Sequence, residues 1–120
     1  MKKVLISMTI LVLPFAIFVS CSKGDAGGGG GSNLDCNTVT NKSFAADVNP
    51  IIQTFCNQQS CHDVASSNGP GPLTNYTQVF NARTSIRAAV ATGVMPQNTT
   101  LSTTQKNTII CWIDGRAQNN

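Results

Sequence analysis

The stretch CNQQSCH, Cys56–His62, places two cysteines and a histidine within seven residues of a chain rich in Ser, Thr and Asn. Such a cluster has three common uses in proteins: a disulfide that staples the fold, a metal clip, or the attachment point of a larger cofactor. The choice between these uses decides how a small domain is held together and what the chain does.

The N-terminal part of the chain carries targeting signals rather than a fold. Lys2 and Lys3 precede an apolar stretch over 4–19, and the small residue Ser20 precedes Cys21, as in a signal peptide over residues 1–20. The ending FVSC resembles the lipobox of bacterial lipoproteins, so we expect cleavage before Cys21 and lipidation of that cysteine. The alternatives are an uncleaved anchor and an ordinary secretory peptide, and all three export the chain.

A glycine-rich segment over 21–33 separates this signal from the rest of the chain. It contains five consecutive glycines, which have no side chain to bury and lose the most backbone entropy on ordering. We expect a flexible, lipid-anchored linker here, followed by one folded domain over 34–120. A domain of this size buries a modest core and often needs a staple or a cofactor.

The charge of the mature chain is close to zero. The formal net charge is +3, but two of the eight Lys and Arg residues lie in the signal, which leaves +1. A balance this small argues against nucleic acid as a partner, because nucleic-acid binding needs a basic face that displaces counterions. It also predicts little long-range steering of charged partners.

Apolar periodicity and capping residues predict an all-α domain. Helices are expected after a start signal at Asn49-Pro50, over 75–93 as one broken or two short helices, and after a capping box formed by Ser102 and Gln105. Gly93 and Gly115 lie where helix C-terminal caps belong. No segment alternates convincingly as a strand.

A histidine that directly follows the second cysteine of a close pair is typical of covalent c-type haem attachment, usually as C-x-x-C-H. Each thiol adds across a vinyl group of the porphyrin, and the histidine supplies an imidazole ligand to the iron. Here the spacing is two residues longer, so residues 57–60 must bulge outward. The hypothesis is that Cys56 and Cys61 hold one haem c and that His62 is the proximal iron ligand.

Met95 is the candidate for the other axial position of the iron. It precedes Pro96 in the irregular loop VMPQNTT, where the proline stiffens the backbone that would present the thioether. The alternative is a methionine that fills a gap in the core, which is the commoner fate of this residue. Because Met95 lies off any helical stripe, we predict that it is the distal iron ligand.

The remaining cysteines allow more than one pairing. Free thiols rarely persist in an oxidising compartment, and four cysteines permit three disulfide connectivities. If Cys56 and Cys61 are used chemically, only Cys36–Cys111 remains, and this long loop closure would contribute about 4 kcal/mol. The alternative is two plain disulfides, Cys56–Cys61 and Cys36–Cys111, which leaves His62 unexplained.

From about Phe44 to Asn120 the chain resembles a small monohaem class I c-type cytochrome, similar to the short cytochrome c-like domains of exported lipoproteins in the Bacteroidota. The matching pieces are DVNPIIQTFCNQQSCH, GPLTNY, IRAAVATGVMP and TIICWIDGRAQNN. The resemblance implies a small all-α domain packed around one covalent haem, with a helix that ends in the haem motif and a C-terminal helix that crosses it. The expanded motif and the doubled GPGP depart from the family pattern.

The resemblance also implies roles for residues around the haem. Leu73 would touch the porphyrin ring, and Phe55 and Trp112 would pack where the first and last helices cross. Either Pro70 or Pro72 would accept the second N–H bond of the proximal histidine, and the doubled GPGP leaves both open.

Two arginines one helical turn apart, Arg83 and Arg87, are candidates to pair with haem propionates. The alternative is two solvated charges on a helix face. A covalently bound porphyrin would in either case supply a large apolar surface for the short helices of this domain to pack upon.

A six-coordinate haem leaves no site for a substrate, so these features predict an electron carrier rather than an enzyme. Its partners would be redox proteins of the cell envelope, at the periplasm or outer membrane, and its lipid would attach it to the membrane. One alternative is an open-site haem enzyme or sensor, if Met95 does not ligate. Others are a haem-free, disulfide-stapled helical lipoprotein and a zinc site at Cys56, Cys61 and His62, for which a fourth ligand is not apparent.

Overall fold

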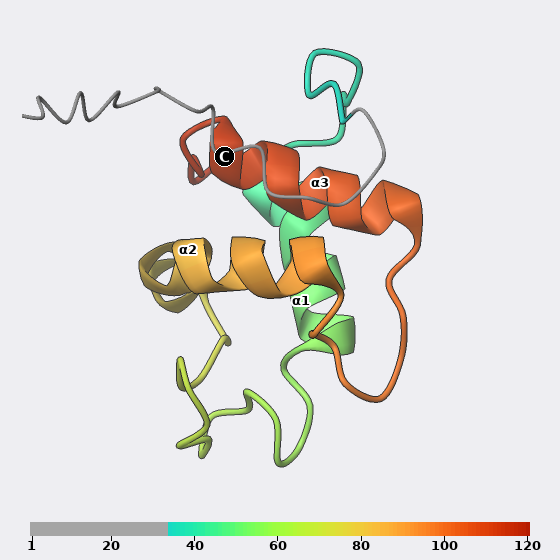
Figure 1. The fold of residues 1–120 in the computed structure, drawn as a ribbon. Helices are drawn as coiled ribbons and strands as arrows, with labels where there is room; N and C mark the ends of the chain where they lie inside the picture. Colours follow the sequence, from blue (N-terminus) through green and yellow to red (C-terminus); the bar gives the residue numbers. More distant parts are fainter. Residues whose placement is uncertain (1–33) are drawn as a thin grey trace, which may run out of the picture.

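The computed structural model describes residues 34–120, which form a helical domain without strands (Figure 1). Its elements in chain order are a short π-helical turn η1 (Phe44–Val48), α1 (Asn49–Phe55), α2 (Tyr76–Thr92) and α3 (Thr103–Asp114). The all-α prediction is confirmed for this part of the chain. The predicted signal peptide, the linker and the lipidation site Cys21 lie outside the described residues. Over residues 34–120, every helix is too short or too polar to cross a bilayer.

The first helical segment starts earlier than the sequence predicted. The cap is Ser43, whose hydroxyl accepts a hydrogen bond from the N–H of Ala46, while the carboxylate of Asp47 accepts one from the N–H of Ser43. Asn49 was expected as the cap but lies inside a continuous helical run, where its side chain accepts from Gln53. The predicted cap was wrong because Ser43, seven residues before Pro50, caps the helical run instead.

α2 is a single helix of 17 residues rather than one broken or two short helices. Its buried side chains, Val79, Ala82, Ile86 and Val90, recur at helical spacing along one face, and no Gly or Pro interrupts them. The helix ends as predicted at Gly93, whose φ of 74° is the left-handed cap conformation that glycine adopts most readily.

α3 is bounded by the predicted signals. Ser102 and Gln105 form a reciprocal capping box, in which each side chain accepts a hydrogen bond from the backbone N–H of the other residue. The helix ends at Gly115, where a Cβ would lie only 3.0 Å from the carbonyl oxygen of Cys111. Both local predictions for this helix are confirmed.

An aromatic cluster joins the first segment to the other two helices. The ring of Phe44 lies 5.3 Å from that of Trp112 and 5.1 Å from that of Tyr76, centroid to centroid. The resemblance implied that Phe55 would be the partner of Trp112. That expectation is wrong in this structure, because the crossing is made by η1, one segment earlier than α1.

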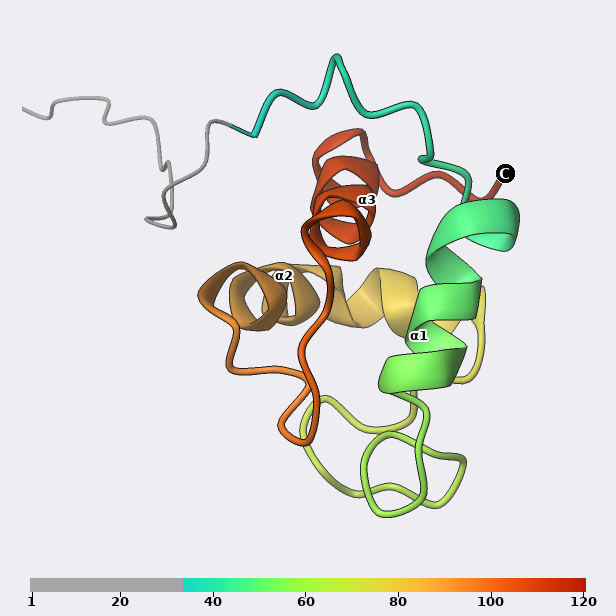
Figure 2. The same cartoon turned by 90° about the vertical axis from the view of Figure 1, so that its right-hand side faces the viewer.

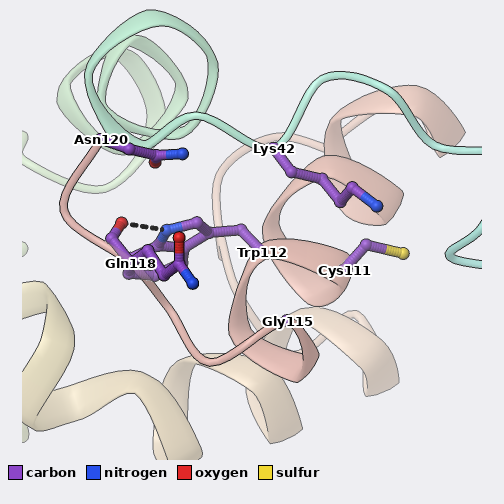
Figure 3. Close-up of a pocket in the computed structure, with 6 residues that line it drawn as sticks. All are labelled: Lys42, Cys111, Trp112, Gly115, Gln118 and Asn120. Atoms are coloured by element: carbon purple, nitrogen blue, oxygen red, sulfur yellow. Dashed lines mark hydrogen bonds between the residues drawn. The ribbon is translucent and has the colours of Figure 1, made fainter.

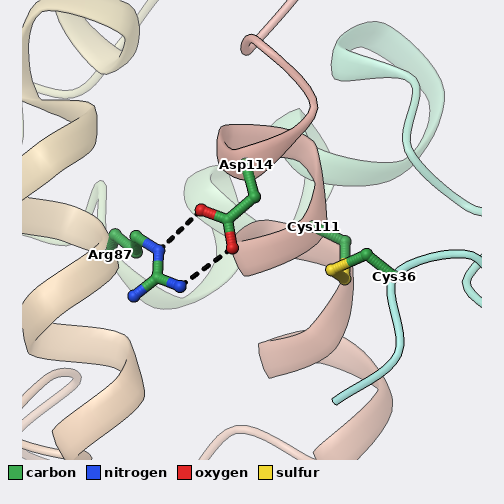
Figure 4. A network of polar contacts seen from close by, with 4 residues as sticks. All are labelled: Cys36, Arg87, Cys111 and Asp114. Atoms are coloured by element: carbon green, nitrogen blue, oxygen red, sulfur yellow. Dashed lines mark hydrogen bonds and ion pairs between the residues drawn. A yellow bond between two sulfur atoms is a disulfide. The ribbon is translucent and has the colours of Figure 1, made fainter. Parts of the chain in front are cut away.

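A disulfide and an ion pair hold α3 to its neighbours (Figure 4). Cys36 and Cys111 are bonded, as predicted, and the bond ties the N-terminal lead of the domain to α3. Arg87 of α2 makes two parallel hydrogen bonds to the carboxylate of Asp114, at 2.6 and 2.8 Å. The carboxylate raises the pKa of the Arg87 guanidinium through these bonds.

The structure gives the two arginines other partners than propionates. Arg87 is held by Asp114, and the guanidinium of Arg83 lies 4.0 Å above the ring of Phe80 while donating to the carbonyl oxygen of that residue. Neither arginine lies on the wall of the cavity described below. The suggestion that they face a haem is therefore not supported by the geometry.

The helices pack together on one side of the domain, and the long loops lie on the other. In both views α3 packs on α2, the η1–α1 segment crosses this pair, and the two longest loops extend together on the side of α2 away from α3 (Figures 1 and 2). These loops are residues 57–75 and 93–102, and the Cys56–His62 motif lies at the start of the first one.

Candidate functional site

A cavity of about 380 Å³ lies between the two loops and α2. That volume falls in the range of small-molecule and cofactor sites. The walls bring together most residues that the sequence singled out: Cys56, Cys61, His62, Leu73 and Met95. Most of the remaining wall is apolar and comes from the end of α1, from α2 and from loop 93–102: Phe55, Ile86, Ala89, Val90, Val94 and Pro96.

The backbone between Cys56 and His62 folds back on itself. The N–H of Gln58 and the N–H of His62 both donate to the carbonyl oxygen of Cys56, at 2.8 and 3.2 Å, and the N–H of Cys61 donates to the carbonyl of Gln58 at 2.9 Å. Ser60 takes a φ of 66° to complete the turn. The bulge predicted for residues 57–60 is therefore present, and it returns the second cysteine and the histidine to the end of α1.

Gln58 also anchors this turn to α1. Its side-chain amide donates to the carbonyl oxygens of Gln53 and Thr54, at 3.1 and 2.8 Å, in the last turn of the helix. Those carbonyls have no partner within the helix, so a side-chain donor satisfies them. The longer motif thus contributes a helix cap through Gln58.

The imidazole of His62 has a defined orientation. Only 8% of the residue is exposed, and its Nδ1 lies 2.9 Å from the carbonyl oxygen of Gly71. Because a carbonyl can only accept, Nδ1 carries the proton. Nε2 has no hydrogen-bond partner among residues 34–120 and is not fully enclosed, and the residue lies on the cavity wall.

The acceptor for His62 is neither of the two prolines considered from the sequence. It is Gly71, which stands between Pro70 and Pro72 and has a φ of 92°. This left-handed conformation favours glycine and turns the carbonyl toward the imidazole. The same part of the loop is held by a second hydrogen bond, from the N–H of Leu73 to the carbonyl oxygen of His62, at 2.9 Å.

Cys56 and Cys61 are free thiols, and both are half-buried. Burial raises the pKa of Cys56 to about 11, and the neighbouring Cys61 adds a smaller increase. A cysteine that acts as a nucleophile or redox catalyst has a lowered pKa, so this environment does not favour such roles for Cys56. The protonated thiol is instead suited to a place beside an apolar ligand.

Met95 lies on the cavity wall at the start of loop 93–102. Its N–H donates to the carbonyl of Ala89, at 3.3 Å, which ties the loop to the last turn of α2. Leu73 is 2% exposed and lies on the same wall. The structure thus places a thioether and an imidazole nitrogen on one cavity, although they are far apart in the sequence.

A second, smaller cavity of about 230 Å³ lies beside the disulfide (Figure 3). Two of its polar groups already make hydrogen bonds within the chain. The indole N–H of Trp112 donates to the carbonyl oxygen of Gln118, and the ammonium of Lys42 donates to the carbonyl oxygen of Cys36. It contains no free thiol and no histidine. The chemistry of the described residues therefore concentrates at the larger cavity.

The zinc alternative receives no support from this arrangement. Within residues 34–120, no three His, Cys, Asp or Glu side chains are grouped closely enough to hold a metal ion. Cys56, Cys61 and His62 share a cavity wall but do not form such a group.

Sequence reasoning missed two contributors to the site. α2 supplies a wall through Ile86 and Val90, which the apolar pattern identified only as core, and Gly71 supplies the acceptor for the histidine. The helical spacing of Ile86 and Val90 was visible, but their opening onto a cavity depends on how the loops fold.

Comparison of the chain with protein-family models, with curated proteins and with solved structures finds no match.

Proposed function

We propose that this chain is an electron carrier, a small c-type cytochrome that holds one covalent haem through Cys56 and Cys61, with His62 and Met95 as axial iron ligands. The observation that carries the proposal is the convergence of both thiols, an open imidazole nitrogen and a methionine on the walls of one largely apolar cavity. When bound, the haem would carry one electron at a time by cycling its iron between the ferrous and ferric states.

The residues of the cavity fit this cofactor. The two thiols stand at the wall, where the Cys56–Cys61 turn brings them to the end of α1. The Gly71 carbonyl holds the proton of His62 on Nδ1, which would keep Nε2 available as a ligand. Apolar side chains of α2 line the same space and would pack on the porphyrin.

The proposed axial ligands, His62 and Met95, favour an electron carrier over an enzyme. If His62 and Met95 both bind the iron, no coordination position is left for a substrate. His62 is the only histidine in the chain, so no second imidazole could assist peroxide cleavage. If Met95 does not bind the iron, the proposed function is instead a haem enzyme or sensor with an open coordination position.

The proposed setting is the bacterial cell envelope, on the periplasmic side or at the outer membrane. A lipid on Cys21 would anchor the chain, and the glycine-rich segment over 21–33 would serve as the tether of the domain. Its partners would then be redox proteins of the envelope, which a tethered domain meets at a raised local concentration.

A haem-free, disulfide-stapled helical lipoprotein is the second candidate. It is favoured by one observation: the disulfide, the aromatic cluster and the Arg87–Asp114 pair all lie away from the cavity and would hold the helices without a ligand. Its chemistry would be limited to binding or to a structural role.

The test is to produce the full chain in a bacterial host with cytochrome maturation machinery and to stain the denatured protein for covalent haem. Met95→Ala is then expected to lose the six-coordinate, low-spin spectrum and to have a lower reduction potential. Thr99→Ala, on the same loop but exposed and off the cavity wall, is the matched control and should retain both. Coloured Met95→Ala protein with an unchanged spectrum and potential would contradict the ligand assignment.

A further inference from the structure

The chain contains a single Asn-Gly pair, Asn68-Gly69, which lies in loop 57–75. An asparagine followed by glycine is prone to deamidation, because no Cβ on the glycine hinders the approach of its main-chain nitrogen to the side-chain amide. Both residues are exposed, and a Cβ on Gly69 would meet nothing within 4 Å beyond its chain neighbours. Water therefore has access to this pair.

The main-chain nitrogen of Gly69 is not held by the fold. Its N–H makes no hydrogen bond within residues 34–120. Asp114-Gly115 offers a comparison, because an aspartate before glycine can form the same imide. There the N–H of Gly115 donates to the carbonyl oxygen of Cys111 at 2.9 Å, and Arg87 holds the Asp114 carboxylate. Of these two pairs, only the one in the loop has a free nitrogen.

Asn68 is linked by hydrogen bonds to the histidine of the cavity. Its side-chain amide donates to the carbonyl oxygens of Ser60 and Cys61, at 2.9 and 3.2 Å. Its main-chain carbonyl accepts from the N–H of Gly71, whose own carbonyl oxygen lies 2.9 Å from Nδ1 of His62. A change at Asn68 therefore acts on the loop segment that orients the imidazole.

We propose that Asn68 is a site of spontaneous modification, whose deamidation places a carboxylate on the cavity wall and loosens the hold on His62. The Gly69 nitrogen loses its proton to base and bonds to Cγ of Asn68, while the Cγ–Nδ2 bond breaks and ammonia leaves. Water then opens the resulting imide at one of its two carbonyl carbons, which gives aspartate or isoaspartate. The reaction consumes water, releases ammonia and needs no oxidant.

Either product removes contacts that the amide makes. A carboxylate cannot donate, so both hydrogen bonds to the carbonyls of Ser60 and Cys61 are lost, and oxygen atoms face each other there. In isoaspartate the main chain runs through the former side chain of Asn68. The carbonyl that accepts from Gly71 then leaves the main chain as well, and the hold on His62 weakens further.

The new charge also acts on a group bound in the cavity, because Asn68 lies on the cavity wall. This part of the inference rests on the proposed electron-carrier function. A negative charge near a haem favours the ferric over the ferrous iron by Coulomb attraction, so the modified protein should have a lowered reduction potential.

The first test is peptide mapping by mass spectrometry of the folded, full-length protein kept in mildly alkaline buffer. The peptide with Asn68 should gain about 1 Da with time and appear as separate aspartate and isoaspartate forms. Gly69→Ala should lose this gain over the time in which half of the wild-type protein reacts. Its new Cβ has room, and the φ of Gly69 is not left-handed. The Asp114-Gly115 peptide is the internal control and should not accumulate isoaspartate.

An unchanged mass at Asn68, an equal gain in Gly69→Ala, or a faster change at another asparagine would overturn the proposed modification site.

The second test uses Asn68→Asp, which carries the carboxylate from the start. His62 is the only histidine in the chain, so nitrogen-15 NMR of the imidazole reports its tautomer in the haem-free protein. The wild type should hold the proton on Nδ1, and Asn68→Asp should shift toward a mixture of tautomers. Asn98→Asp, exposed on loop 93–102 and off the cavity wall, is the matched control and should leave the tautomer unchanged. Equal spectra for the wild type and Asn68→Asp would contradict the link to His62.

These outcomes are separate from those of the proposed function. A colourless protein would overturn the haem assignment alone, because the mass and the tautomer are measured without haem. In coloured protein, Asn68→Asp should have a lower reduction potential than Asn98→Asp. Equal potentials would overturn the predicted effect on the cofactor.

Discussion

The two pairs of cysteines mark regions of the domain that are built differently. At one region Cys36 and Cys111 are bonded to each other, next to an aromatic cluster and a bidentate ion pair that join the helices. At the other, Cys56 and Cys61 are free and stand on the wall of a cavity framed by loops. The first region is stabilised by contacts within the chain, whereas in the second the apolar side chains of α2 and loop 93–102 line a cavity.

Breaking the disulfide should have the largest effect on the stability of the fold. The double variant Cys36→Ala/Cys111→Ala opens a closure between residues 75 apart in sequence and is expected to lower the free energy of unfolding by about 4 kcal/mol. Denaturant unfolding of the haem-loaded protein measures this value. The visible spectrum should not change while the protein is folded, because neither cysteine of the disulfide lies on the cavity wall. A spectrum that changes together with stability would show that the two regions are not separate.

The thiol of Cys56 should give the haem-free protein a dependence on alkaline pH. Burial, with a smaller contribution from Cys61, raises its pKa in the folded state from 9.0 to about 11. The folded state therefore favours the protonated thiol. The resulting stability is fully present below about pH 9 and is lost as pH rises to about 11, by at most about 3 kcal/mol.

Carbon-13 NMR of labelled cysteine Cβ atoms reads this titration directly, without interference from tyrosine. The Cys61→Ala variant should lower the pKa of Cys56 slightly, because the contribution of Cys61 is removed. In the haem-loaded protein the same carbon should not titrate, since a thioether has no proton to lose. A pKa near 9 for Cys56 in the haem-free protein would show that the thiol is not buried as described.

Removing the cap at Gln58 should have an intermediate effect, located at the cavity. Gln58→Ala loses two hydrogen bonds to the end of α1 and is expected to cost about 1–2 kcal/mol of stability. Gln59→Ala is the matched control, because the neighbouring residue is exposed and its side chain makes no hydrogen bond within the described region. Thermal unfolding compares the two variants, and equal melting temperatures would remove the proposed role of the longer motif.

The ion pair at the opposite region should contribute least. Arg87 and Asp114 are 35% and 39% exposed, so the substitution Asp114→Asn should lower stability by less than about 1 kcal/mol in spite of the bidentate geometry. The loss should shrink as salt is added, because exposed charges are screened. Denaturant unfolding at low and high salt checks both statements, and a larger, salt-independent loss would indicate a less exposed pair.

Local signals in the sequence predicted much of the fold. The capping box of Ser102 and Gln105 and the cap at Gly93 depend on hydrogen bonds and dihedral angles within a few residues, so their sequence patterns were sufficient. η1 was missed because part of its support comes from the far end of the chain: the hydroxyl of Ser43 and the N–H of Ala45 donate to the carbonyl of Asn120.

The candidate site was predictable in its residue types and not in its supporting contacts. The spacing of Cys56, Cys61 and His62 was recognisable because attachment chemistry requires these residues close together in sequence. The acceptor at Gly71 was not, because it depends on a left-handed backbone conformation that the prolines on both sides do not predict. The Asp114 partner of Arg87 was not predicted for a similar reason, since only the packing of α2 on α3 brings this carboxylate to it.

The most direct test of the central claim is the intact mass of the exported protein together with a count of its titratable thiols after denaturation. We predict a mass increased by one haem and no thiol at Cys56 or Cys61, while the Cys36–Cys111 disulfide remains. A protein with the mass of the polypeptide and its acyl chains alone would contradict the account, whether those two cysteines are then found as free thiols or joined to each other.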